Sequence, residues 1–298
     1  MSLSPKTLKL AARDAMHTCV PPAFLVTLLF LTLTDVLSEI VYAFTPVGTT
    51  ADPLQAVPLF LSILLLMFRI VMSFGYSSWT LQTARGEEVG LGGLLDGFGM
   101  VGRVLLLKLH TIAGMLGRML LLTTAYVLLS TSVTVLLPFS VSTVLFLLLT
   151  AAYALGLQAV EIQFSLAPFL LCDYPDEGSS RAVLRALHMT HGNLWALIKL
   201  HLSFWPWYLL QFAISACAAA LILSPMLPEI SQIEIMGDIP QIITSVEYAV
   251  SSALSSPVTV LVSIPLLTFF LPYRSISVAN FYRSLNGELS QPEEPAFF

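Results

Sequence analysis

The chain has 298 residues, of which 56% are hydrophobic and 10% are charged. Ordinary globular proteins are about 45–50% apolar and about 25% charged, so a soluble fold of this composition would expose large apolar patches and aggregate. The composition therefore excludes a soluble domain and indicates an integral membrane protein. The formal net charge of −5 and the lack of basic runs give no support to nucleic-acid binding.

Six apolar stretches are long enough to cross a bilayer as helices, because about 20 residues span roughly 30 Å of hydrocarbon. They are residues 20–43, 57–81, 104–129, 142–170, 195–222 and 249–271. The first is longer than the apolar part of a signal peptide, and no small-residue cleavage motif follows it. The sequence therefore predicts an all-α membrane protein with six transmembrane helices.

Lysine and arginine are sorted to one side of these stretches. Of the 13 Lys and Arg residues, only Arg69 and Arg118 lie deep inside a stretch. The connections 44–56, 130–141 and 223–248 contain neither residue type. Since positive residues concentrate in cytoplasmic loops, we expect both termini in the cytoplasm.

The six spans are expected to form three hairpins within one domain, residues 1–288. The hairpins cover about 1–88, 89–177 and 178–288. Each is preceded by a short cytoplasmic segment expected to lie at the membrane interface, namely 3–16, 90–102 and 178–191. The middle segment is rich in glycine, which disfavours a stable helix. The tail 289–298 is expected to be disordered.

Two features suggest an internal repeat. The tripeptide Lys108-Leu109-His110 recurs as Lys199-Leu200-His201 at the same place in its hairpin. The even-numbered spans also end alike, with aromatic residues, a turn and an acid, at 79–87, 169–177 and 281–288. Together they predict a threefold parallel repeat about an axis normal to the membrane. The acids at 173, 176 and 177 are interpreted as a solvated helix start.

Ionisable residues inside the spans call for a partner or a role, because each costs at least about 2.5 kcal/mol in the bilayer core. They are Asp35, Glu39, Arg69, Arg118 and Glu161. Asp35 and Glu39 share one helical face, and the depth of Arg69 predicts an Arg69–Asp35 pair. Arg118 and Glu161 form a second candidate pair, although their depths differ by about 9 Å. Such pairs could line a polar path or substrate site, or could only set helix register.

An aromatic cluster surrounds a proline in the fifth span. It consists of Trp205, Pro206, Trp207 and Tyr208. A proline inside a helix removes a backbone hydrogen bond, so we predict a kink there. The aromatic side chains either line a cavity for an apolar ligand or pack against neighbouring helices.

Four stretches in the C-terminal half carry a family resemblance. They are FSLAPFLLCDYP (164–175), ALHMTHGN (186–193), LSFWPWYLL (202–210) and LPYRSISVANFY (271–282). In this order and spacing the chain resembles the bacterial integral membrane proteins classed as domain of unknown function 975, which are distantly similar to the membrane domains of some glycerophosphodiester phosphodiesterases. The resemblance implies a multi-pass protein of the bacterial cell membrane and brings no activity or catalytic residue.

No enzyme motif, metal-ligand spacing or cofactor motif is present in the sequence. We therefore expect no catalytic residue, metal or cofactor. One hypothesis is a non-enzymatic protein that binds membrane lipid, a partner membrane protein or a second copy of itself, in support of envelope assembly or an exporter. The alternative is a transporter or channel with a polar path through the bundle. A water-accessible cavity touching Arg69 or Arg118 would favour transport, and a lateral apolar groove would favour binding.

Overall fold

The computed structural model describes residues 4–39, 56–136, 138–224 and 257–289, and all regular elements in these ranges are helical. The elements in chain order are α1 (Pro5–Thr18), α2 (Ala23–Leu31), the π-helix η1 (Thr32–Val36), α4 (Ala56–Arg85), the 3₁₀-helix η3 (Leu91–Met100), α5 (Val101–Leu136), α6 (Phe139–Gln163), α7 (Ala167–Asp173), the 3₁₀-turn η4 (Pro175–Glu177), α8 (Ser179–His191), α9 (Leu194–Leu202), α10 (Trp205–Leu223) and α13 (Pro257–Leu285).

Five helical stretches among the described residues are long and apolar enough to cross a membrane. A sixth is added if α1 and the helix Ala23–Glu39, which meet at 90°, are counted as one bent span. The predicted all-α membrane class is therefore confirmed. Residues 40–43 and 249–256 of the predicted spans, and the predicted disordered tail beyond Leu289, lie outside the described residues.

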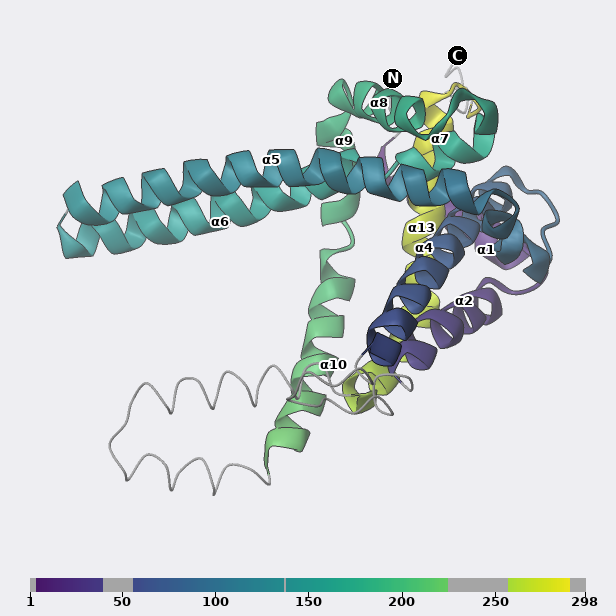
Figure 1. Ribbon diagram of the computed structural model, residues 1–298, viewed down its shortest axis with the longest axis horizontal. Coiled ribbons are helices and arrows are strands. Elements are labelled where there is room, and N and C mark those ends of the chain that lie inside the picture. The colour runs from purple at the N-terminus through teal and green to yellow at the C-terminus, as the bar shows by residue number, and fades with distance from the viewer. Residues whose placement is uncertain (1–3, 40–55, 137, 225–256, 290–298) are drawn as a thin grey trace, which may run out of the picture.

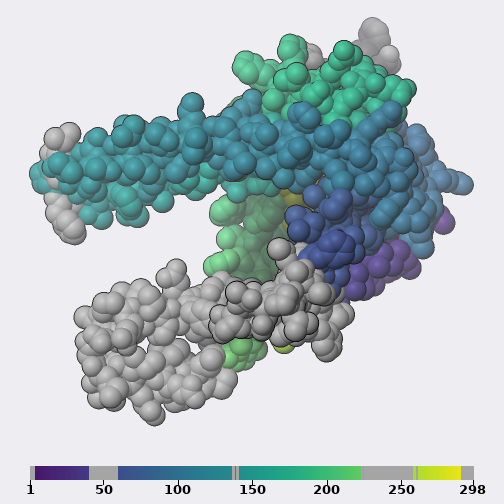
Figure 2. Space-filling model, viewed as in Figure 1, coloured from purple at the N-terminus to yellow at the C-terminus, as the bar shows by residue number. Residues whose placement is uncertain are grey.

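The long helices do not form three equivalent hairpins. Helix α13 packs against α1, α2, α4 and α10. Helices α5 and α6 pair with each other and extend away from this group, across the direction of α10 (Figure 1). Figure 2 shows the α5–α6 hairpin projecting from the rest of the described chain. Its surface is apolar and exposed, with Leu120 72% exposed and Leu128 65% exposed. The arrangement therefore does not confirm a threefold repeat.

The main core lies where α4, α7, α8 and α13 meet, at one end of the long helices. Its buried side chains include Phe74, Leu171, Ala186, Phe281 and Tyr282. The predicted segments 3–16 and 178–191 are indeed helices, α1 and α8, and each buries one face, through Leu8 and Ala182 for example. This core fixes the helix ends on which the polar residues described below are placed.

The glycine-rich segment 90–102 contains the 3₁₀-helix η3, which packs closely on α4 at one glycine from each helix. A Cβ atom built on Gly75 would lie 1.9 Å from the carbonyl oxygen of Leu94, and one on Gly97 would lie 2.5 Å from that of Val71. No side chain fits at either position, so the two backbones can touch only through glycine. Gly97 thus allows η3 to pack on α4, whereas Gly92, Gly99 and Gly102 have open space at their Cβ positions.

Two predicted spans are interrupted, each shortly before a proline. The predicted span 142–170 divides into α6 and α7 at residues 164–166, and Pro168 lies in the first turn of α7. The predicted span 195–222 divides into α9 and α10 at residues 203–204, and Pro206 lies in the first turn of α10. A proline in the first helical turn loses no intrahelical bond. The predicted interior kink at Pro206 is therefore wrong, because a helix starts there.

Candidate functional site

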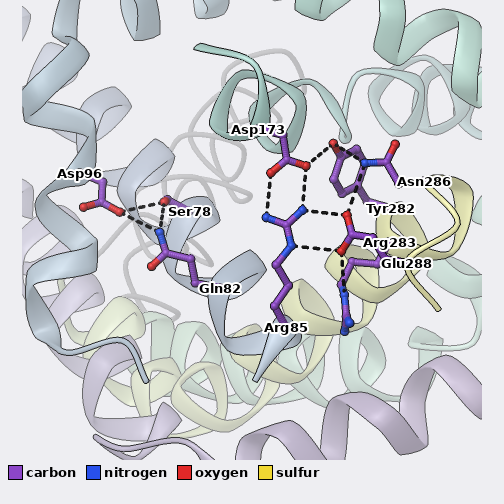
Figure 3. Close-up of polar contacts among 9 residues, drawn as sticks. All are labelled: Ser78, Gln82, Arg85, Asp96, Asp173, Tyr282, Arg283, Asn286 and Glu288. Carbon is purple, nitrogen blue, oxygen red and sulfur yellow. Dashed lines mark hydrogen bonds and ion pairs between the residues drawn. The ribbon is translucent and has the colours of Figure 1, made fainter. Parts of the chain in front are cut away.

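Six side chains join the ends of α4, α7 and α13, and we call this group the Arg85 clamp. Its members are Arg85, Asp173, Tyr282, Arg283, Asn286 and Glu288 (Figure 3). Arg85 donates two bonds of 2.8 Å to the two oxygens of Asp173. It also donates to both oxygens of Glu288, at 3.1 and 2.8 Å. Fork-to-fork pairs of this kind are the stronger class of ion pair.

The remaining members of the clamp complete the network. The Tyr282 hydroxyl donates to Asp173 Oδ2 at 2.7 Å and accepts from the Asn286 amide at 3.1 Å. Arg283 donates to Glu288 Oε2 at 3.2 Å and to the carbonyl oxygen of Ala84. Two guanidinium groups thus balance two carboxylates. The Arg85 guanidinium holds the pKa of the Glu288 carboxyl below its usual value.

Glycine turns at the helix ends make the clamp possible. Gly86 follows α4 with φ of +77°, and the next amide, of Glu87, bonds to the carbonyl of Gln82 at 3.1 Å. Gly287 follows α13 with φ of +75°, and the Glu288 amide bonds to the Arg283 carbonyl at 3.0 Å. These are left-handed caps that favour glycine. The second turn directs Glu288 back towards Arg85.

A polar cavity of about 350 Å³ lies beside the clamp, between α4, η3 and α7. Its lining residues are Phe74, Ser78, Leu81, Gln82, Arg85, Glu87, Asp96, Met100, Cys172 and Asp173. Positions 78, 82 and 85 share one face of α4. On that face the Ser78 hydroxyl and the Gln82 amide both donate to Asp96 Oδ2, at 2.9 and 3.2 Å (Figure 3).

An apolar groove of about 470 Å³ lies between α10 and α13, and we call it the α10–α13 groove. Its lining residues are Ala213, Ile214, Cys217, Ala218, Leu221, Ile222, Val258 and Val262. The α10 residues recur at helical spacing and so belong to one face. The described residues of this lining include no charged side chain.

The structure brings Asp35 and Arg69 together. Asp35 lies in η1, and its Oδ1 is 2.9 Å from Nη2 of Arg69 on α4. The Arg69 side chain is 59% exposed and that of Asp35 is 25% exposed, so the pair lies at the surface of the described chain. Glu39 lies one turn further along, at the end of the described part of that helix. A π-helical turn such as η1 is often associated with functional positions.

The predicted Arg118–Glu161 pair is not formed. Arg118 instead donates to Oε1 of Gln163 and lies over the ring of Phe164, 5.1 Å from its centroid. Glu161 is exposed on α6. Positions 161 and 163 are two residues apart on α6 and therefore point to different faces of the helix, so Gln163 meets Arg118 whereas Glu161 is exposed.

The aromatic residues after the α9–α10 break pack against α13. The Trp207 ring stacks on Phe270 at 5.8 Å, and the Tyr208 ring meets the same phenylalanine edge-on at 5.1 Å. Trp205 is 56% exposed. None of these residues lines the α10–α13 groove. Of the two interpretations left open by the sequence, packing is therefore the one observed.

A lysine from α1 satisfies the backbone at this break. The Lys9 ammonium donates to the Ser203 carbonyl oxygen at 2.7 Å and lies 4.1 Å from the centroid of the Phe204 ring. Burial lowers the pKa of this ammonium group. The contact was not predicted, because nothing in the sequence relates residues 194 positions apart.

The clamp was also missed as a site. Asp173 was interpreted as part of a solvated helix start, but its side chain is only 13% exposed and is held by Arg85. The signal that could have found it was the similar endings of the even-numbered spans. All three carry a positive-φ glycine, at Gly86, Gly178 and Gly287.

The long apolar helices and the uncharged groove are those of a multi-helix membrane protein. The chain belongs to the family described as "Protein of unknown function (DUF975)", whose model matches residues 1–288. No curated protein and no solved structure matches the chain. The family resemblance is thus confirmed, whereas the distant similarity to glycerophosphodiester phosphodiesterases stays a prediction.

Proposed function

We propose that this chain is a non-enzymatic, multi-pass protein of the bacterial cell membrane that binds lipid, with an acyl chain in the α10–α13 groove. Both termini and the Arg85 clamp lie on the cytoplasmic side. The observation that carries the proposal is the groove itself, about 470 Å³ in volume and lined by aliphatic side chains, alanines and one cysteine.

The chemistry of the groove favours hydrocarbon as its ligand. A polar solute would have to leave its hydrogen-bonding partners in water, which costs free energy in an apolar site. The volume lies within the range of about 300–1,000 Å³ that is usual for ligand pockets. The small side chains of Ala213, Cys217 and Ala218 on α10 leave the room that a larger residue would fill.

The position of the charged groups favours binding over transport. Neither the groove nor the polar cavity is lined by Arg69 or Arg118. The charges of the clamp neutralise one another at a helix junction, as expected for a structural anchor. A partner membrane protein or a second copy seated on the same apolar face is the competing occupant.

Lipid analysis after mild detergent extraction tests the proposal. Phospholipid bound per protein is measured for the wild type, for Cys217→Phe, which fills the groove, and for Leu209→Phe, which introduces the same side chain at an exposed position of α10 outside it. We expect Cys217→Phe alone to lose tightly bound lipid. Equal lipid content in all three proteins would refute the lipid site, and a protein species retained by the wild type alone would assign the groove to a partner.

A further inference from the structure

The polar cavity between α4, η3 and α7 has a charge imbalance that the lipid-binding proposal does not use. Its lining contains three carboxylates, of Glu87, Asp96 and Asp173, and one guanidinium, of Arg85. The formal charge of these described lining residues is therefore −2. Arg85 already forms ion pairs with Asp173 and Glu288, so its positive charge does not neutralise Glu87 or Asp96.

Asp96 is held in a fixed orientation at the cavity wall. The Ser78 hydroxyl and the Gln82 amide both donate to the same oxygen, Oδ2, and the amide also donates to the Ser78 hydroxyl at 3.1 Å. Phe74 and Leu81 on α4 and Met100 on η3 add apolar side chains to the lining, interleaved along these helices with the polar ones. The cavity thus offers negative charge next to hydrocarbon.

The arrangement of these groups favours an organic cation over a metal ion. Both oxygens of Asp173 accept bonds from Arg85. Within the described ranges there is no group of three or more His, Cys, Asp or Glu side chains that could hold a metal. An ammonium group needs only acceptors for its hydrogens, and it can lie over an aromatic ring such as that of Phe74. The apolar side chains of the lining suit a short carbon chain.

We propose that this cavity binds a small organic ammonium ion, with its charge at Asp96 and Glu87 and its carbon chain against Phe74, Leu81 and Met100. The site is separate from the groove between α10 and α13, so failure of one proposal leaves the other standing.

Burial raises the pKa of the Cys172 thiol to about 12, so a reporter cysteine is placed instead at Met100, a partly exposed lining residue. In a Met100→Cys, Cys19→Ser, Cys172→Ser, Cys217→Ser background, purified protein is treated at neutral pH with 2-aminoethyl or 2-sulfonatoethyl methanethiosulfonate, which differ mainly in charge. Intact-mass measurement gives the modification rate at position 100, and each rate is divided by the rate of the same reagent with free cysteine. A cavity lined by one sign of charge concentrates counter-ions by about tenfold or more. We expect the ammonium reagent to be favoured by about that factor, and butylammonium, but neither butyrate nor butanol, to slow the reaction.

Charge-removing variants locate the effect. Asp96→Asn and Glu87→Gln should each reduce the preference for the ammonium reagent, whereas Asp14→Asn, at an exposed position on α1, should leave it unchanged. If Asp96→Asn does not fold, Glu87→Gln and the wild-type protein still decide the question. A charge preference no greater than that of free cysteine, or equal protection by butanol, would overturn the proposal. Protection by Mg²⁺ without protection by butylammonium would overturn it as well.

Discussion

Arg85 at the end of α4 and Asp173 at the end of α7 form a two-pronged ion pair, with both nitrogen–oxygen distances at 2.8 Å, although 88 residues separate them. Glu288, beyond α13, accepts from the same guanidinium. One arginine therefore ties together the ends of three helices that belong to distant parts of the sequence.

Removal of Arg85 should destabilise the protein more than removal of an ordinary surface arginine. Arg85→Leu leaves the partly buried Asp173 carboxylate without a cation and leaves Glu288 with Arg283 alone, and we expect a loss of about 2–3 kcal/mol in the free energy of unfolding. Arg103 is the matched control, because it lies 3.7 Å from an Asp176 side chain that is 95% exposed. Arg103→Leu should cost no more than about 0.5 kcal/mol. Thermal unfolding in detergent measures both, and equal losses would contradict the clamp.

The contact of η3 with α4 predicts a difference between glycines of the same region. Gly75→Ala places a methyl group against the Leu94 carbonyl and should cost about 1–3 kcal/mol. Gly99 has open space where its Cβ would lie, so Gly99→Ala should be neutral or slightly stabilising. The same unfolding assay distinguishes the two variants. Tolerance of alanine at position 75 would show that η3 does not pack as described.

The Asp35–Arg69 pair predicts coupling between two variants. Arg69→Leu and Asp35→Leu should each lower stability by about 1–2 kcal/mol, less than in a fully buried pair because both side chains are partly exposed. The double variant should recover much of the loss, since neither charge is then left alone. Arg118→Leu combined with Asp35→Leu is the control and should give additive losses. Additivity for the Asp35–Arg69 combination would mean that the two residues do not interact.

The clamp also predicts a loss of stability in acid. The pKa of Glu288 is lower in the folded protein than in the unfolded chain, mainly because Arg85 donates to its carboxylate. Its contribution is therefore complete above the ordinary glutamate pKa of about 4.3 and is lost as the pH falls through the lower, folded value. Glu288→Gln should flatten this part of the stability–pH curve. An unchanged stability–pH curve would show that the ion pair of Glu288 does not stabilise the folded protein.

The sequence predicts the helical membrane class well, because bilayer thickness demands long apolar runs that composition reveals directly. It also predicts the Asp35–Arg69 contact, since two opposite charges at similar depth in neighbouring helices have few other partners. These inferences depend on local pattern and on depth alone.

The clamp and the direction of α5–α6 could not be predicted in the same way. In the sequence, Asp173 has no partner nearby, so it is interpreted as solvated. Its partner Arg85 comes close only through tertiary packing, where the turns at Gly86 and Gly287 bring the helix ends together. Arg118 contacts Gln163 rather than Glu161, because the face that α6 turns towards α5 is set by tertiary packing. The position of a proline in its helix could not be predicted either. Pro206 lies in the first turn of α10, whereas Pro272 lies inside α13.

The central prediction is that the helices cross the membrane with the Arg85 clamp on the cytoplasmic side. Single cysteines at Glu88, just beyond the clamp end of α4, and at Ser224, at the far end of α10, test this directly. Intact cells are treated with a membrane-impermeant maleimide, with and without permeabilisation. The account predicts labelling at position 224 in intact cells and at position 88 only after permeabilisation. Labelling at position 88 but not at position 224 in intact cells would contradict it.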